Sequence, residues 1–180
     1  MQVPTLVPFV RRMLLIAVAL VGCFSTRSAS ASSLTGTWIL DPARSDEVAA
    51  WRNLELVVAT DGESVTLTRN LGWGRRRFSD SVTVTPGSGT AVQPLPWWAD
   101  IRHIGVYAVD NAERTVEAAY LDDGRTLRTE SRFMVETQQG VAPMRITTEF
   151  RLWPDGDRLT MIEIRSSRPT PITYAFVRKP

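Results

Sequence analysis

From residue 34 onward the chain alternates hydrophobic and polar residues in short runs that turn-forming residues separate. Alternation with a period of two is typical of β-strands, and no stretch past residue 31 keeps the period of an amphipathic helix. The strongest local signal is Asp61-Gly62 between "LELVVAT" and "SVTLTRN", which predicts a tight hairpin. About ten strands are expected, at residues 36–41, 54–60, 64–70, 78–85, 104–110, 115–121, 125–136, 144–153, 158–165 and 172–178.

Two of these segments indicate how the sheet is buried. Successive side chains of a strand point to opposite sides of the sheet. Residues 144–153 therefore have a charged face and a mostly apolar face, the latter made of Met144, Ile146, Thr148, Phe150 and Leu152. Residues 125–136 divide in the same way, with an uncharged face made of Leu127, Thr129, Ser131, Phe133 and Val135. A sheet with water on one side only is expected.

Most links between the predicted strands are short, and residues 111–114 predict a further hairpin between 104–110 and 115–121. Only the links at 41–53 and 86–100 are long. A long meander buries its apolar face and hides its edges when it closes on itself. We therefore predict an all-β, antiparallel up-and-down barrel of about 8–10 strands over residues 34–180. A two-layer sandwich is the rival, but its long crossovers are not visible.

The first residues have the pattern of an export signal. Arg11-Arg12 precede the apolar run "MLLIAVALVG", and Ala29-Ser30-Ala31 is an A-x-A cleavage site. The apolar run is shorter than the roughly 20 residues of a membrane-spanning helix. We therefore expect residues 1–31 to be a signal peptide that directs the chain to the periplasm, the cell envelope or the medium.

Cys23 offers a second way of processing this signal. The sequence Leu20-Val21-Gly22-Cys23 resembles the bacterial lipobox, whose cysteine is lipid-modified and becomes the first residue of the mature protein. Residues 1–22 would then be the signal, and residues 24–33 would be a tether to the membrane. Cys23 is the only cysteine, so neither route leaves a disulfide within the chain. Both lipid anchoring and plain secretion remain open.

Charge argues against a nucleic-acid partner. Without residues 1–31 the chain loses three arginines and no acidic residue, so its formal charge changes from +2 to −1. Positive and negative residues alternate along the rest of the chain, and "GRRRF" at 74–78 is the only basic run. A nucleic-acid-binding face would need a larger basic patch.

The stretch "LTGTWILDPARSD" at residues 34–46 resembles the opening of exported bacterial lipocalin-like domains, which are calycin-type β-barrels. Gly36 and Trp38 match their G-x-W motif, and "LWPDGDRLTM" resembles a hairpin near the end of those domains. The resemblance implies that Trp38 closes one barrel end and that Arg178 packs over its ring. Other lipocalin features, a loop motif and a long C-terminal helix, are absent from the sequence. A retinoid-type or haem-type ligand is therefore not implied.

Catalytic patterns are scarce in the sequence. His103 is the only histidine, so no histidine cluster can bind a metal or share acid–base work. No serine lies in a nucleophile elbow, and "DGD" at 155–157 lacks the spacing of a calcium loop. We therefore predict that the chain is not an enzyme and has no metal site or cofactor.

The barrel interior and its mouth are the remaining candidates for a ligand site, because a barrel of this size can enclose a small molecule. The candidate ligand-binding residues are Trp98, Tyr120, Phe133, Met144, Ile146, Phe150 and Tyr174. The alternative is that these side chains simply fill the core. Trp97-Trp98, on the long link beside two prolines, are compatible with a lid, a partner contact, a membrane-facing tip or a cap on one barrel end.

Three functional hypotheses follow from the sequence. The first is an exported protein that binds a small hydrophobic ligand in the barrel. The second is a non-enzymatic cell-envelope interaction module with a solid core, tethered through Cys23. The third is a barrel isomerase or cyclase, which requires an ionisable residue that points into the barrel. The sequence specifies neither the ligand, the partner nor the oligomeric state.

Overall fold

The computed structural model describes residues 34–46, 53–95 and 106–180. The predicted signal peptide, Cys23, Trp97, Trp98 and His103 lie outside the described residues. The strands are β1 Gly36–Leu40, β2 Asn53–Asp61, β3 Ser64–Trp73, β4 Arg76–Val84, β5 Ala91–Pro94, β6 Tyr107–Ala108, β7 Glu113–Leu121, β8 Thr126–Thr137, β9 Gly140–Leu152, β10 Arg158–Arg165 and β11 Ile172–Arg178. A 3-10 turn at Asp122–Gly124 links β7 to β8. No helix in the described ranges has the length and apolar character needed to cross a membrane.

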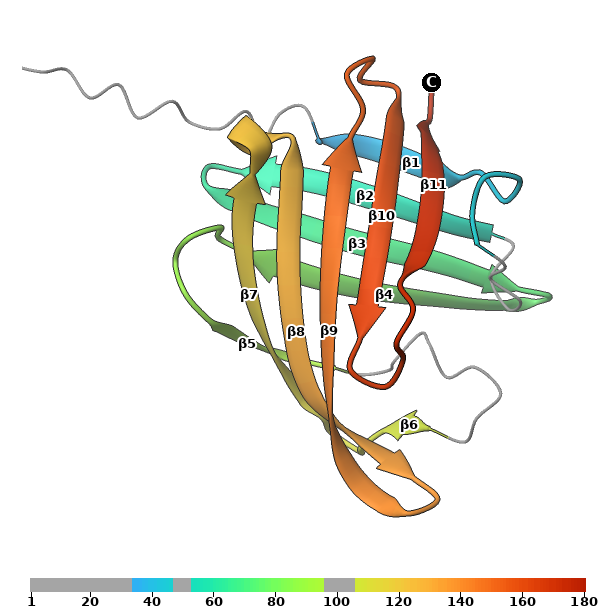
Figure 1. Ribbon diagram of the computed structural model, residues 1–180, viewed down its shortest axis with the longest axis vertical. Coiled ribbons are helices and arrows are strands. Elements are labelled where there is room, and N and C mark those ends of the chain that lie inside the picture. Colours follow the sequence, from blue (N-terminus) through green and yellow to red (C-terminus); the bar gives the residue numbers. More distant parts are fainter. Residues whose placement is uncertain (1–33, 47–52, 96–105) are drawn as a thin grey trace, which may run out of the picture.

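All strand pairs are antiparallel and belong to one sheet of 11 strands. Its order is β4-β3-β2-β1-β11-β10-β9-β8-β7-β5, and β6 pairs with β8 beside this path. Because β1 pairs with β11, the first strand joins the two halves of the sheet. Figure 1 shows strands β1 to β4 lying across strands β7 to β11, so that the sheet curls into a nearly closed barrel. The predicted all-β antiparallel barrel is confirmed, with more strands than expected.

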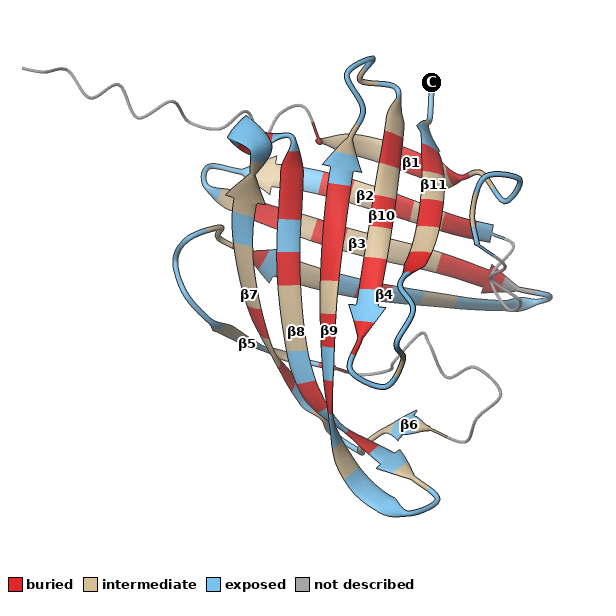
Figure 2. Ribbon diagram, in the orientation of Figure 1, coloured by how far each residue is buried: buried red, intermediate tan, exposed pale blue. Residues whose placement is uncertain are grey.

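The alternation read from the sequence sets which side of the sheet is buried. In β9, Met144, Ile146 and Phe150 are buried, whereas Arg145 and Arg151 are exposed. The strand β8 repeats this pattern, and Figure 2 shows buried and exposed positions alternating along the strands of this half. Two apolar clusters fill the interior, a large one around Trp38, Leu56 and Phe176 and a smaller one of Leu95, Phe133, Val135, Met144 and Ile146.

The predicted hairpin between residues 104–110 and 115–121 is wrong. Tyr107 and Ala108 pair with Glu136 and Val135 of β8, and β7 pairs with β8 further along. Thus β6 and β7 both pair with β8 and run in the same direction. Residues 109–112 interrupt the pairing between them. Asn111 has a φ of 54° there, a conformation that asparagine tolerates better than most residues. The other edge of β7 pairs with β5, a short strand that was not predicted from the sequence.

The barrel closes without a backbone ladder between its two end strands, β4 and β5. The Gln93 side chain on β5 bridges instead to the main chain of Thr83 on β4. Its carbonyl accepts from Thr83 N at 3.0 Å, and its amide donates to Thr83 O. On β7, which pairs with β5, Arg114 Nη2 donates to Ser81 O of β4 at 2.6 Å. We call this side-chain-bridged junction of β4 with β5 and β7 the seam.

The predicted contact between Trp38 and Arg178 is present. Arg178 Cζ lies 4.1 Å from the centroid of the Trp38 ring, and Trp38 is 0% exposed. The guanidinium also donates to Thr35 O at 2.8 Å and, through Nε, to Gly156 O at 2.9 Å. Gly36 has a φ of +144°, and a Cβ at this position would lie 2.5 Å from Arg178 Nη1. Glycine is therefore required for the close approach of the arginine.

Candidate functional site

Among the described residues, five charged side chains occupy inward positions of the barrel, where the alternation would otherwise place apolar residues. Arg69 of β3 follows Val65 and Leu67 on the inner face. On β10 the inner face continues from Leu159 and Met161 to two charged residues. The full set, which we call the interior charge row, is Arg165, Glu163, Arg69, Asp80 and Arg114.

The interior charge row alternates in sign across the barrel. Arg165 Nε lies 2.5 Å from Glu163 Oε1, and Glu163 Oε2 lies 3.7 Å from Arg69 Nη1. Arg69 Nη2 then donates to Asp80 Oδ2 at 3.0 Å. Asp80 also accepts two hydrogen bonds from Arg114, at 2.8 and 2.9 Å, so one end of the row lies at the seam. Within the described ranges, the row joins three arginines to two carboxylates.

Burial makes this pairing obligatory, because an unpaired ion in a low-dielectric interior is costly. The side chains of Asp80, Arg114 and Glu163 are 3%, 4% and 1% exposed. Burial raises the pKa of the Asp80 carboxyl, but the hydrogen bonds and charges of Arg114 and Arg69 lower it by more. The net result is a pKa below the usual 3.8, so Asp80 is ionised at neutral pH.

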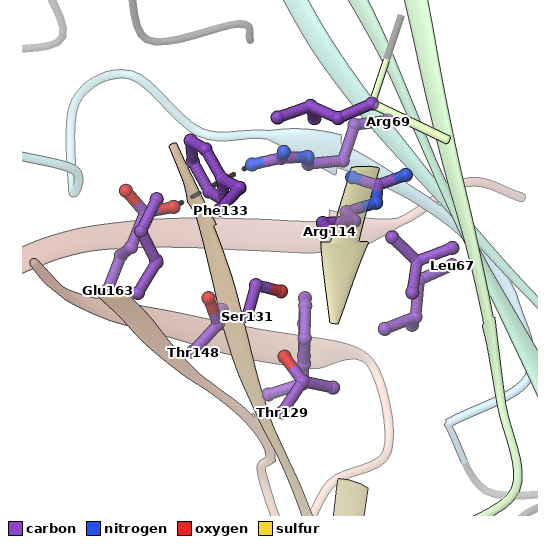
Figure 3. A pocket seen from close by; sticks show the side chains of 12 residues that line it. Leu67, Arg69, Arg114, Thr129, Ser131, Phe133, Thr148 and Glu163 are labelled. Carbon is purple, nitrogen blue, oxygen red and sulfur yellow. Dashed lines mark ion pairs between the residues drawn. The ribbon is translucent and has the colours of Figure 1, made fainter. Parts of the chain in front are cut away.

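A cavity of about 50 Å³ lies beside the row. Figure 3 shows the side chains that line it. Its apolar wall is formed by Leu67, Val82, Leu95, Phe133, Ile146 and Phe150. Its polar wall is formed by Arg69, Arg114, Thr129, Ser131, Thr148 and Glu163. Arg114 Nε is buried without a hydrogen-bond acceptor. A buried donor of this kind calls for an acceptor such as a water molecule or a ligand atom.

The residues predicted as ligand contacts separate into three groups. Phe133, Ile146 and Phe150 line the interior cavity. Tyr174 is buried in the large apolar cluster, and Tyr120 packs against that cluster. Met144 faces a different hollow, at the end of the barrel. The structure thus places only part of the predicted set together, and their role in ligand binding stays a prediction.

The charged half of the cavity was not predicted from the sequence. The sequence nonetheless contains a signal for these charges, because Arg69 and Glu163 stand at positions where the alternation of their strands places apolar residues. The two strands whose faces the alternation distinguishes most clearly, residues 125–136 and 144–153, carry no residue of the row. Which of these charges meet depends on the pairing of strands far apart in the chain, and no local pattern gives that.

The comparisons with known proteins leave the function open. No protein-family model matches the chain, and no curated protein matches it in sequence. Among solved structures, the fatty-acid-binding protein isolated from Manduca sexta is similar to the chain, with a TM-score of 0.45 and 12% sequence identity. The alignment covers 81% of this chain and 98% of that protein. A likeness at this level carries no argument about what this chain binds.

The row limits the chemistry that the site can perform. The barrel interior is not strictly apolar, so the ionisable group that an isomerase or cyclase needs is present. However, a carboxylate held ionised by two guanidinium groups, as Asp80 is, makes a weak proton acceptor near neutral pH. Within the described ranges, no group of three His, Cys, Asp or Glu side chains could hold a metal ion. The arrangement is suited to binding a polar or anionic group next to an apolar wall.

Proposed function

We propose that this chain is a non-enzymatic barrel that holds a small molecule with an apolar side and one hydrogen-bond-accepting or anionic group. The observation that carries the proposal is Arg114 Nε, a buried donor without an acceptor on the wall of the interior cavity. The apolar side of the ligand would contact Phe133, Ile146 and Phe150.

The cavity volume restricts the size of this ligand. A cavity of about 150 Å³ is enough for benzene, and the interior cavity has about a third of that volume, about 50 Å³. It accommodates roughly three to five water molecules by the usual allowance for each. A ligand of a few non-hydrogen atoms, such as a short-chain carboxylate, fits without repacking of the core.

Propionate titration followed by NMR tests this proposal, with 1-propanol as the uncharged counterpart. Thr148 points into the cavity and Thr147 lies on the outer face of the same strand. Thr148→Leu should fill the cavity and abolish propionate binding, and the matched variant Thr147→Leu should retain it. Native mass spectrometry of protein from its source should show a bound small molecule. A bare chain mass, together with propionate binding that Thr148→Leu leaves unchanged, contradicts the proposal.

A second candidate is a cell-envelope interaction module with a solid core, and the small volume of the interior cavity favours it. In this case the function would lie on the surface, with Trp97 and Trp98 as candidate contacts. A pull-down from the source organism with the double variant Trp97→Ala/Trp98→Ala tests it. Partner capture that persists in the double variant removes these tryptophans from the interaction.

We further propose that the chain is exported to a bacterial cell envelope or secreted. The support is the sequence pattern of residues 1–31 together with the lipobox-like stretch at Cys23. Mass analysis of the protein from its source distinguishes the two routes. A lipidated N-terminal Cys23 indicates anchoring, an N-terminus at Ser32 indicates plain secretion, and an intact Met1 contradicts both.

A further inference from the structure

A second hollow lies where the hairpin of β8 and β9 extends past β7 and β10. Pairing of β9 with β10 stops at Ile146, and pairing of β7 with β8 stops at Arg132. The hairpin continues to Thr137 and Gly140, and the loop that follows β10 lies beside this extension. The hollow between them has a volume of about 170 Å³, and we call it the mouth groove.

The floor of the mouth groove is apolar and well packed. It is formed by Val106, Val135, Ala142 and Met144, which belong to the smaller apolar cluster or pack against it. Val135 is 1% exposed and Met144 is 6% exposed, so these side chains are anchored in the core. An apolar group in the groove would therefore meet a preformed surface.

The rim of the mouth groove is basic and carries hydroxyl groups. It consists of residues 165–168, "RSSR". The backbone fixes this segment, because Ser166 N donates to Arg145 O at 2.9 Å and Arg168 N donates to Arg165 O at 3.1 Å. Ser166 Oγ accepts in return from Arg145 N at 3.0 Å.

The two arginines of the rim differ in their electrostatic partners. The Arg165 guanidinium is held by Glu163 of the interior charge row. Arg168 forms no ion pair with any acidic residue of the described ranges, and its side chain is half-buried against the groove. The rim therefore presents one uncompensated positive charge beside an apolar floor.

From this combination we infer that the mouth groove is a second binding site, for a small molecule with one apolar ring and one carboxylate. The volume is slightly larger than the cavity of about 150 Å³ that accepts benzene. The ring lies on Val135, Ala142 and Met144, and the carboxylate pairs with Arg168 and accepts from the hydroxyl of Ser167. The site is distinct from the interior cavity, because the two hollows share no lining residue.

Calorimetric titration of the full-length chain with benzoate tests the inference. Benzyl alcohol provides the same ring without the charge, and acetate provides the charge without the ring. We expect benzoate to bind at least tenfold more tightly than either, because only benzoate uses both the floor and the rim. Equal affinity for benzoate and benzyl alcohol overturns the role of the rim.

Two variants with matched controls locate the binding. Arg168→Gln should weaken benzoate about tenfold and leave benzyl alcohol unchanged, whereas Arg75→Gln, at an exposed turn, should change neither. Ala142→Leu should fill the floor and abolish binding of both compounds. Ala119→Leu, an exposed position on β7, is its control. Thermal unfolding of all four variants verifies that they are folded.

The outcomes separate this inference from the proposed function. Thr148→Leu fills the interior cavity and should leave benzoate binding intact, and Ala142→Leu should leave propionate binding intact. Benzoate binding lost in Thr148→Leu but kept in Ala142→Leu overturns the mouth groove as the site. No benzoate binding to the folded wild-type chain overturns the inference without affecting the interior proposal.

Discussion

The Asp80 carboxylate of β4 accepts two hydrogen bonds from the Arg114 guanidinium of β7, at 2.8 and 2.9 Å, across a seam that has no backbone ladder. This bidentate pair therefore has two roles. It ends the interior charge row, and it holds together the two end regions of the sheet. Arg114, which lines the proposed ligand cavity, is thus also one of the side chains that close the barrel.

Removing the charge of Asp80 should destabilise the fold strongly. In Asp80→Asn, Arg114 stays buried without its anionic partner, which typically costs about 3–5 kcal/mol in the free energy of unfolding. Urea denaturation measures this loss, and Asp61→Asn, at the exposed end of β2, is the control. In the double variant Asp80→Leu/Arg114→Met both charges are absent, so we expect it to be more stable than Asp80→Asn. A loss below about 1 kcal/mol in Asp80→Asn would show that the pair does not hold the seam.

The contribution of Asp80 should also depend on pH. Its pKa in the folded protein lies below the usual 3.8, so its ionic stabilisation is complete above that pH and is lost as the pH falls through the folded-state value. The stability difference between wild type and Asp80→Asn should be constant between about pH 5 and pH 7 and shrink in stronger acid. Urea denaturation over this pH range measures it. A difference that does not change on acidification contradicts the lowered pKa.

Gly36→Ala tests the close approach of Arg178 to Trp38. The new Cβ would meet Arg178 Nη1 at 2.5 Å, so the guanidinium must leave its place over the indole ring or the strand must shift. We expect a loss of roughly 1–3 kcal/mol in the free energy of unfolding. Gly62→Ala is the control, because Gly62 also has a positive φ but has open space around its Cβ position. Equal losses for the two variants would mean that backbone conformation alone requires Gly36.

Gln93→Ala tests the other bridge of the seam. The variant loses both hydrogen bonds to the main chain of Thr83, which should cost about 0.5–1.5 kcal/mol each. Hydrogen–deuterium exchange should show faster exchange of the Thr83 amide and of its neighbours on β4. Gln138→Ala, at the exposed end of the β8–β9 hairpin, is the control. Unchanged exchange on β4 in Gln93→Ala would show that other contacts hold the seam.

The barrel itself was predictable, because strand alternation and turn residues are local signals. The faces of β8 and β9 and the contact between Trp38 and Arg178 were foreseen from sequence and resemblance. The position of β6 was not, since the residues at 111–114 predict a reversal of the chain. Whether such residues reverse a strand or only interrupt it depends on the neighbour, here the long strand β8.

The sequence alone determined the period of the pattern, and therefore an antiparallel sheet with one apolar face that has to close. The tertiary structure decided which inward charges meet, because Arg69, Asp80, Arg114 and Glu163 come from four different strands. Each is a local exception to the apolar face, and only the curvature of the sheet brings them within ion-pairing distance. Buried charges are tolerated only when they are paired with opposite charges. The charged wall of the cavity therefore depends on the closed barrel.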